Sequence, residues 1–140
     1  IDLRLYIQEQ LPLKSDQARV KVLLQNLIVN AVKYSNPKAD KPFCEVRIDV
    51  MENEAIIEVK DNGRGIPKNQ QEKIFEMFYR PEQSISGSGL GLYLVQQVVD
   101  KLNGKIQLHS EVEEGSTFFI SIPNKMMYQS PKRNLLGGTG

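Results

Sequence analysis

The chain has 140 residues, of which 40% are hydrophobic and 25% are charged, and its formal net charge is +1. These values are typical of one globular domain with a real core, and the charge gives no support for a nucleic-acid partner. The single cysteine, Cys44, excludes an internal disulfide and a multi-cysteine metal site, and no apolar run reaches the roughly 18 residues of a membrane span. Because the chain begins at Ile1 and not at a methionine, we expect it to be part of a longer protein.

The first half of the chain predicts a strand, a long helix and a β-hairpin. Residues 1–7 alternate apolar and polar side chains, which predicts a strand with one buried face. The apolar positions of that strand are Ile1, Leu3, Leu5 and Ile7. Ser15 or Asp16 can cap the helix that apolar spacing predicts over residues 16–34. The hairpin is expected over residues 44–61, where Cys44 is better explained as a packed residue than as a catalytic one.

The second half adds two helices and two strands. The pattern predicts a short helix over 69–76, a long helix over 90–102, and strands over 105–111 and 116–123. The chain is therefore expected to be an α+β two-layer sandwich, in which about three helices cover one face of a mixed sheet of about five strands. We expect the domain to span residues 1–123. Residues 124–140 are expected to form a C-terminal tail, disordered or partly derived from a tag.

The motif "DNGRGIP" begins with a carboxylate at the end of a buried strand. Asp61 shares the parity of the buried residues before it, so its carboxylate needs a hydrogen-bond donor. Backbone amides of the following turn would give Asp61 a structural role. The exocyclic amine of an adenine base is the alternative donor, with Gly63 and Gly65 making room for the flat base and Ile66 covering it.

The motif "NLIVNAVKY" places polar side chains in register on the first long helix. Asn26 and Asn30 are four residues apart, and Lys33 lies one turn further on the same face. A solvated polar face explains such a pattern without any ligand. The functional alternative is a row in which an amide oxygen binds Mg²⁺ and Lys33 binds phosphate, with the hydroxyl of Tyr34 nearby.

The motif "GSGLGL", residues 87–92, leads into the second long helix. It matches neither a phosphate-binding P-loop nor the dinucleotide-binding fingerprint. A glycine-rich approach to a helix N-terminus still favours phosphate, because free N–H groups and the helix dipole point towards it. A merely flexible entry to the helix explains the motif equally well.

Taken in order, "NLIVNAVKY", "DNGRGIP", "IFEMFYR", "GSGLGL" and "GSTF" resemble the ATP-binding catalytic domain of sensor histidine kinases. That domain belongs to the Bergerat-fold (GHKL) group, together with gyrase, Hsp90 and MutL. The resemblance extends over about residues 1–123. The third motif contains Phe75, Phe78 and Tyr79, which resemble the aromatic residues of the family's F box.

The resemblance implies a set of residues around Mg-ATP. These are Asn26, Asn30, Lys33, Tyr34, Asp61, Gly63, Gly65, Ile66, Arg80, Gly87, Gly89, Leu90, Gly91 and Thr117. Asn30 would hold Mg²⁺, and Asp61 would bind the adenine amine. Thr117 would support Asp61, although Ser116 is an alternative for that place. Arg80 would reach the terminal phosphate.

The resemblance also implies a reaction and partners. The chain would donate the γ-phosphate of ATP to a histidine on the dimerisation and histidine-phosphotransfer domain of the same kinase, and a response regulator would act next. The parent would be a homodimer anchored in the inner or plasma membrane, with this domain in the cytoplasm. The only histidine, His109, is expected to face away from the buried side of its strand, so we do not expect it to accept phosphate.

Three alternatives stay open from the sequence. A gyrase- or Hsp90-type ATPase would need a base to activate water, and those families have glutamate at the position of Asn26, whose amide cannot accept a proton. A serine kinase with a similar pocket is the second alternative. A pseudokinase that keeps the pocket as a scaffold is the third.

Overall fold

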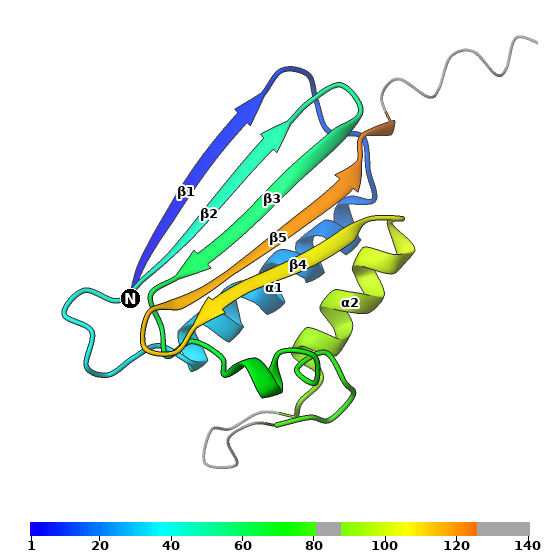
Figure 1. The fold of residues 1–140 in the computed structure, drawn as a ribbon. Helices are drawn as coiled ribbons and strands as arrows, with labels where there is room; N and C mark the ends of the chain where they lie inside the picture. The colour runs from blue at the N-terminus through cyan, green and yellow to red at the C-terminus, as the bar shows by residue number, and fades with distance from the viewer. Residues whose placement is uncertain (81–87, 126–140) are drawn as a thin grey trace, which may run out of the picture.

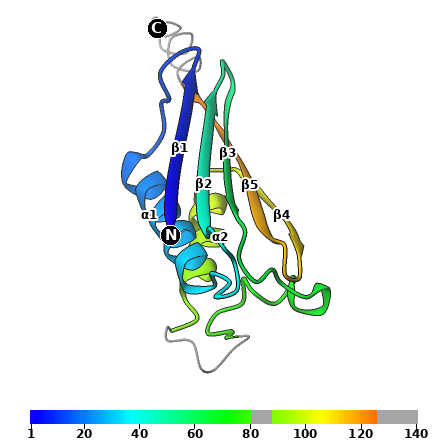
Figure 2. The same ribbon diagram turned by 90° about the vertical axis from the view of Figure 1, so that its left-hand side faces the viewer.

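The computed structural model describes residues 1–80 and 88–125. Its elements are β1 (Asp2–Glu9), α1 (Gln17–Lys33), β2 (Phe43–Val50), β3 (Glu54–Asp61), the 3-10 turn η1 (Lys68–Gln70), α2 (Gly91–Lys101), β4 (Lys105–Glu111) and β5 (Gly115–Pro123). The strands form one sheet in the order β1-β2-β3-β5-β4, with β1 parallel to β2 and every other pair antiparallel. Both helices lie on one face of this sheet (Figures 1 and 2).

This arrangement confirms the expected two-layer sandwich, with one difference. The short helix expected over residues 69–76 is a single 3-10 turn, η1, followed by further turns. The backbone hydrogen bonds of this stretch do not follow one regular spacing. Lys73 N–H and Ile74 N–H both donate to the carbonyl of Gln70, three and four residues before them, so no continuous α-helix forms. In the described part of the chain, neither helix is long and apolar enough to cross a membrane.

Helix α1 begins and packs as its sequence predicts. The side chain of Asp16 accepts a hydrogen bond from Arg19 N–H at 3.1 Å, which satisfies one of the free donors at the helix N-terminus. The buried side chains of α1 are Leu23, Leu27 and Ala31, which recur every four residues and face the sheet. Their burial fixes which polar residues of α1 point away from the core.

Helix α2 buries Val95 and Val99 against the sheet beside α1. It ends where Asn103 adopts a left-handed conformation, with φ of 59°, and Gly104 N–H donates to the carbonyl of Val99 at 2.9 Å. This is the expected stop at Asn103-Gly104, because the backbone there folds back onto the last free carbonyls of the helix.

Strand β1 forms as expected, but the prediction that its apolar face is buried is wrong. The apolar side chains Ile1, Leu3, Leu5 and Ile7 are all exposed, Leu5 by 61%. Their register with β2 places them on the side of the sheet that faces the helices. However, α1 packs mainly against β2 and β3, and these side chains of β1 stay exposed. Alternation reveals which side chains share a face, but burial also needs a partner over that face.

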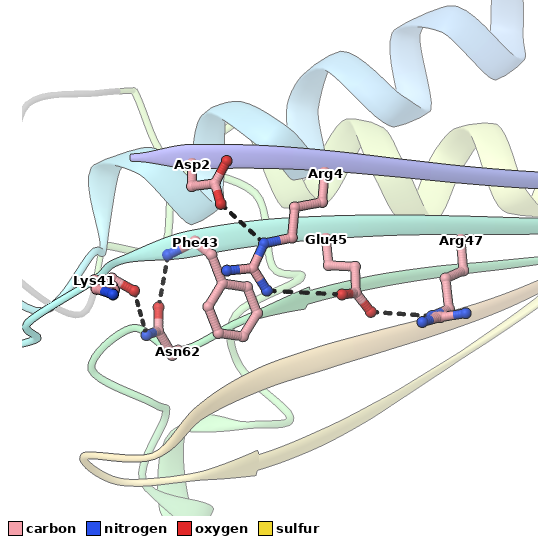
Figure 3. A network of polar contacts seen from close by, with 7 residues as sticks. All are labelled: Asp2, Arg4, Lys41, Phe43, Glu45, Arg47 and Asn62. Atoms are coloured by element: carbon pink, nitrogen blue, oxygen red, sulfur yellow. Dashed lines mark hydrogen bonds and ion pairs between the residues drawn. The ribbon is translucent and has the colours of Figure 1, made fainter.

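The opposite face of β1 and β2 carries charged side chains. Arg4 lies between Asp2, at 2.9 Å, and Glu45, at 4.0 Å, and Arg47 pairs with the same glutamate at 3.0 Å (Figure 3). The guanidinium group of Arg4 also lies 4.5 Å above the centre of the Phe43 ring. Such largely exposed pairs add little to the free energy of unfolding.

Asn124, the first residue of the expected tail, is fully buried. Its side-chain oxygen accepts from Lys14 N–H at 2.9 Å, and its amide nitrogen donates to the carbonyls of Pro12 and Met51 at 3.2 and 2.9 Å. The side chain therefore joins the end of β5 to the segment before α1 and to the end of β2. Most of the expected tail, residues 126–140, lies outside the described residues.

Candidate functional site

A cavity of about 540 Å³ lies between α1, the N-terminus of α2, the loop after β3 and the turn between β4 and β5. It is lined by Asn26, Val29, Asn30, Lys33, Tyr34, Asp61, Arg64, Gly65, Ile66, Pro67, Gln70, Ile74, Tyr79, Arg80, Ser88, Gly89, Gly91, Leu92, Val112, Glu113 and Ser116. The lining is apolar along one part and charged along another. Its size suits a small organic ligand of mixed polarity.

The cavity gathers most of the residues that the sequence places in a nucleotide site. Those that line it are Asn26, Asn30, Lys33, Tyr34, Asp61, Gly65, Ile66, Arg80, Gly89 and Gly91. Gly63, Leu90 and Thr117 do not line it, and Gly87 lies outside the described residues. Four segments that are far apart in the sequence therefore meet here, although the role of each residue in binding stays a prediction.

Asp61 ends β3 with its carboxylate at the cavity. Its Oδ1 atom accepts hydrogen bonds from Gly63 N–H at 2.8 Å and from Ser116 N–H at 3.3 Å. Within the described residues, Oδ2 accepts none. Burial raises the pKa of this carboxyl above its ordinary value, although the two amide bonds act in the opposite direction. Backbone amides thus satisfy half of the carboxylate, and the other half is available to a ligand.

The residue that supports Asp61 is Ser116, and the prediction for Thr117 is wrong. In the register of β3 and β5, Ser116 lies opposite Asp61, whereas Thr117 lies opposite Lys60. Neighbouring residues of a strand point to opposite faces, so the side chain of Thr117 lies on the helix-free face of the sheet. Ser116 is buried and lines the cavity.

The glycines after Asp61 allow close packing of backbone segments within the chain. A Cβ atom on Gly63 would lie 2.6 Å from the carbonyl oxygen of Tyr34, and one on Gly65 would lie 2.0 Å from that of Glu111. Gly65 also has φ of +73°, which side chains disfavour. The space that a Cβ atom would take at these glycines is filled by protein backbone, and their part in shaping a base pocket stays a prediction. They let the loop after β3 approach α1 and β4.

Asn62, the residue after Asp61, anchors the same loop through its side chain. The side chain of Asn62 accepts from Phe43 N–H at 2.8 Å and donates to the carbonyl of Lys41 at 3.0 Å (Figure 3). Both partners lie at the start of β2. The loop is thus anchored immediately beyond the carboxylate that it presents.

The polar row of α1 forms one wall of the cavity. Asn26, Asn30 and Lys33 all line it, with Tyr34 at the C-terminal end of the helix. The amide nitrogen of Asn26 donates to the carbonyl of Val22 at 2.8 Å, and its side-chain oxygen lies towards Gly91 at the start of α2. The three side chains are partly buried and share the cavity with the loop after β3 and the start of α2, so the row is not a fully solvated face.

The N-terminus of α2 faces the same wall. Among the described residues no side chain caps it, and its first two residues, Gly91 and Leu92, line the cavity. Before it, Gly89 has φ of +75° and accepts a hydrogen bond from Phe78 N–H at 2.9 Å. Free N–H groups at the start of a helix favour an anion, so this end of the cavity suits phosphate.

The described residues include no cluster of three His, Cys, Asp or Glu side chains that could hold a metal ion alone. Asn30 offers one amide oxygen. Magnesium keeps several waters and takes phosphate oxygens readily, so one protein oxygen suffices when a nucleotide brings the ion. The donor set therefore fits Mg²⁺ carried by phosphate and does not fit a separate metal centre.

Other lining residues were not predicted from the sequence. Arg64 N–H donates to the carbonyl of Tyr34 at 3.1 Å, and the carbonyl of Arg64 accepts from Glu113 N–H at 2.7 Å. These bonds bring the turn between β4 and β5, including Val112, to the mouth of the cavity. Arg64 belongs to a recognised motif, but no local pattern marks the turn, whose place depends on the sheet order.

Comparison with known proteins agrees with this geometry. A profile of the family described as histidine kinase-, DNA gyrase B-, and HSP90-like ATPase matches residues 15–126. The sensor protein kinase WalK of Staphylococcus haemolyticus is 36% identical over 112 residues, which cover 77% of this chain and 18% of WalK. The circadian input-output histidine kinase CikA of Synechococcus elongatus is 36% identical over 120 residues, which cover 83% of this chain and 16% of CikA.

Among solved structures, a mycobacterial sensor histidine kinase, MprB, matches with a TM-score of 0.71 and 28% identity. The match covers 87% of this chain and 80% of the MprB chain. The present chain spans less than a fifth of the length of WalK or CikA.

Proposed function

Because this chain belongs to the family of histidine kinase-, DNA gyrase B-, and HSP90-like ATPases, we propose that it binds Mg-ATP and supplies the γ-phosphate to a histidine of another domain. It would be the catalytic part of a two-component sensor kinase. The phosphoryl group moves from ATP to an imidazole nitrogen and ADP leaves. In this kind of reaction, positioning and charge neutralisation supply most of the catalysis.

One observation carries the proposal: Asp61 presents to the cavity an oxygen that accepts no hydrogen bond from the described residues. The other oxygen is held by two backbone amides, so the free one has a fixed direction. An exocyclic amine is a donor of the required kind, and Ile66 and Ile74 provide apolar surface for a flat base.

The rest of the cavity suits the phosphates. Lys33 and Arg80 bring positive charge, and the uncapped N-terminus of α2 brings free N–H groups. Asn30 would complete the coordination of Mg²⁺, which neutralises phosphate charge when bound. These residues bind and orient the nucleotide, and the attacking group comes from elsewhere.

Phosphoryl transfer is favoured over hydrolysis by the chemistry of α1. Asn26 occupies the wall of the cavity, and an amide cannot take a proton from water. We therefore expect ATP turnover by this chain to be far below about 1 s⁻¹, a common rate for enzymes. Turnover at that rate in a purified sample would favour a hydrolytic switch instead.

The acceptor histidine would lie outside this chain. His109 is exposed on the helix-free face of the sheet, where its ring packs 5.0 Å from that of Phe119. The cavity is lined by α1 and α2, on the helix-bearing side of the sheet. The acceptor domain would be the dimerisation and histidine-phosphotransfer domain of a homodimeric, membrane-anchored parent kinase, and a response regulator would receive the phosphate next.

A transfer assay tests this function. The chain is incubated with ATP labelled at the γ-phosphate, alone and with the histidine-bearing domain of its parent protein. We expect label on the histidine domain and none on this chain, and Lys33→Ala should reduce the rate. Label retained on this chain after denaturation, or none on either protein, would contradict the proposal.

A further inference from the structure

Strand β1 lies at one edge of the sheet and has an open side. In the order β1-β2-β3-β5-β4 it pairs only with β2, and no second strand of the described residues lies beside it (Figures 1 and 2). All of its residues except Arg4 are exposed. An unpaired strand of this kind offers a row of backbone N–H and carbonyl groups to a strand of another chain.

The other edge of the sheet, β4, is partly covered by the loop after β3. The hydroxyl oxygen of Ser110 in β4 accepts from Ile66 N–H at 2.8 Å, and the carbonyl of Ser110 accepts from the side-chain amide of Gln71 at 3.3 Å. Strand β1 has no comparable cover among the described residues. It also contains neither lysine nor proline, which natural edge strands often use to prevent pairing.

The backbone of β1 alternates between groups that bond to β2 and groups that point to the open edge. At the two ends of the strand, Asp2 N–H donates to the carbonyl of Pro42 at 2.9 Å, and Gln10 N–H donates to that of Val50 at 3.0 Å. The even-numbered residues therefore bond to β2 in the parallel ladder, and the odd-numbered residues direct their N–H and carbonyl groups to the open edge. These odd-numbered residues include Leu3, Leu5 and Ile7.

A second copy of the chain, running antiparallel, fits this edge about a two-fold axis at Leu5. Leu5 then lies opposite Leu5 of the copy, and Leu3 lies opposite Ile7. Because all of these are odd-numbered, they form the hydrogen-bonded pairs of an antiparallel ladder. Their side chains, each more than half exposed in the single chain, then lie beside one another on one face.

The charged residues of β1 favour the same register. With Leu5 on the axis, Arg4 lies opposite Tyr6 of the copy, and no two like charges of β1 face each other. A shift by two residues in one direction would place Arg4 opposite Arg4. A shift in the other direction would place Leu3 opposite Glu9. The sequence of β1 is therefore complementary to itself in one antiparallel register.

We propose that β1 is a self-association edge, through which two copies of this chain pair antiparallel with Leu5 opposite Leu5 and join their sheets into one. The same patch serves both copies, as in other two-fold symmetric dimers. No residue of β1 lines the cavity, so pairing leaves that site in place. The inference does not depend on the proposed function.

Sedimentation of the unmodified chain over a range of concentrations tests the pairing. One pair of strands buries less surface than a standard interface, so we expect a weak dimer that forms at about 100 µM and separates at about 1 µM. Leu5→Lys places two like charges on the axis and should weaken association at least about tenfold. Leu5 is 61% exposed, so the variant should fold, which circular dichroism checks.

A matched control is Leu94→Lys on α2. Leu94 is also exposed, and it does not line the cavity or lie on β1. This variant removes the same apolar side chain and adds the same charge at a place away from the edge. We expect its association to equal that of the unmodified chain.

Cross-linking tests the register. Residues opposite each other in a hydrogen-bonded pair have Cα atoms about 5.5 Å apart, which a disulfide can span. Under mild oxidation Leu5→Cys should therefore form a covalent dimer. Ile7→Cys should not, because two copies of Ile7 would lie about 13 Å apart along the strands. The natural Cys44 is buried and should not compete.

Three results would overturn the inference. The first is a monomer at every concentration. The second is equal weakening of association by Leu5→Lys and Leu94→Lys, which would mean that the copies adhere without using β1. The third is a covalent dimer of Ile7→Cys that forms as fast as that of Leu5→Cys, since the register would then be wrong. Loss of nucleotide binding would affect none of these measurements.

Discussion

Two polar side chains lie at opposite ends of the β3–β5 pair, and they differ in how fully they are hydrogen-bonded. Asn124 follows β5 and is fully buried, and both its amide oxygen and its amide nitrogen are bonded to backbone. Asp61 ends β3, and only its Oδ1 atom is bonded to backbone. One residue completes the fold, while the other leaves an acceptor facing a cavity.

The difference separates a structural polar group from a binding group. A buried polar side chain whose bonds are all made within the chain stabilises one conformation and has nothing to offer a ligand. A side chain that is only half bonded within the chain keeps an acceptor that a ligand can use. We therefore expect changes at Asn124 to act on stability and changes at Asp61 to act on binding.

The comparison assumes that a buried side chain contributes more to the free energy of unfolding than an exposed one. A row of five isoleucines tests this assumption. Ile7, Ile48, Ile57, Ile120 and Ile106 lie side by side across the sheet. Ile57 is fully buried and Ile7 is 53% exposed. In denaturant titrations, Ile57→Ala should lower the free energy of unfolding by about 2–5 kcal/mol. Ile7→Ala should lower it by less than about 1 kcal/mol. Equal losses would mean that an unseen contact covers β1.

Removing the side chain of Asn124 tests the expectation that this residue acts on stability. Asn124→Ala leaves Lys14 N–H and the carbonyls of Pro12 and Met51 without their partner, so we expect the free energy of unfolding to fall by about 2–4 kcal/mol. The exposed Asn53, in the turn before β3, is a matched control for Asn→Ala. Nucleotide affinity of the folded Asn124 variant should be unchanged, and a selective loss of affinity would break the distinction.

The pH dependence of nucleotide binding tests the expectation that Asp61 acts on binding. Burial raises the pKa of Asp61, and a protonated carboxyl no longer offers Oδ2 as a free acceptor. Nucleotide affinity should therefore fall by up to about tenfold per pH unit below that pKa. A folded-state pKa above the unfolded value means that protonation of this group favours the folded chain, so the loss does not reflect unfolding caused by Asp61. Constant affinity in the folded chain would contradict this account.

Much of the site was predictable because it depends on local spacing. The positions of Asn26, Asn30 and Lys33 on one helix face follow from helical periodicity, and that of Asp61 on the helix-facing side follows from strand parity. The cap at Asp16 also follows from local chemistry. Each of these predictions needs only a few neighbouring residues.

The rest depends on contacts between distant segments. The exposure of β1 is decided by how far α1 reaches across the sheet, and the burial of Asn124 by loops more than 70 residues away in the sequence. The choice between Ser116 and Thr117 depends on the register of β5 with β3. A shift of one residue would exchange them, and no local pattern determines that register.

The most direct test of the central claim is calorimetric titration with a non-hydrolysable ATP analogue, with and without Mg²⁺, for the unmodified chain and for Asp61→Asn. Asparagine can keep the bonds that Gly63 N–H and Ser116 N–H make to Oδ1, and it replaces the free acceptor with a donor. We predict binding that strengthens with Mg²⁺ and weakens about a hundredfold in the variant, with the fold retained. Equal binding by both proteins would contradict the role of Asp61, and no binding by the unmodified chain would contradict the nucleotide site itself.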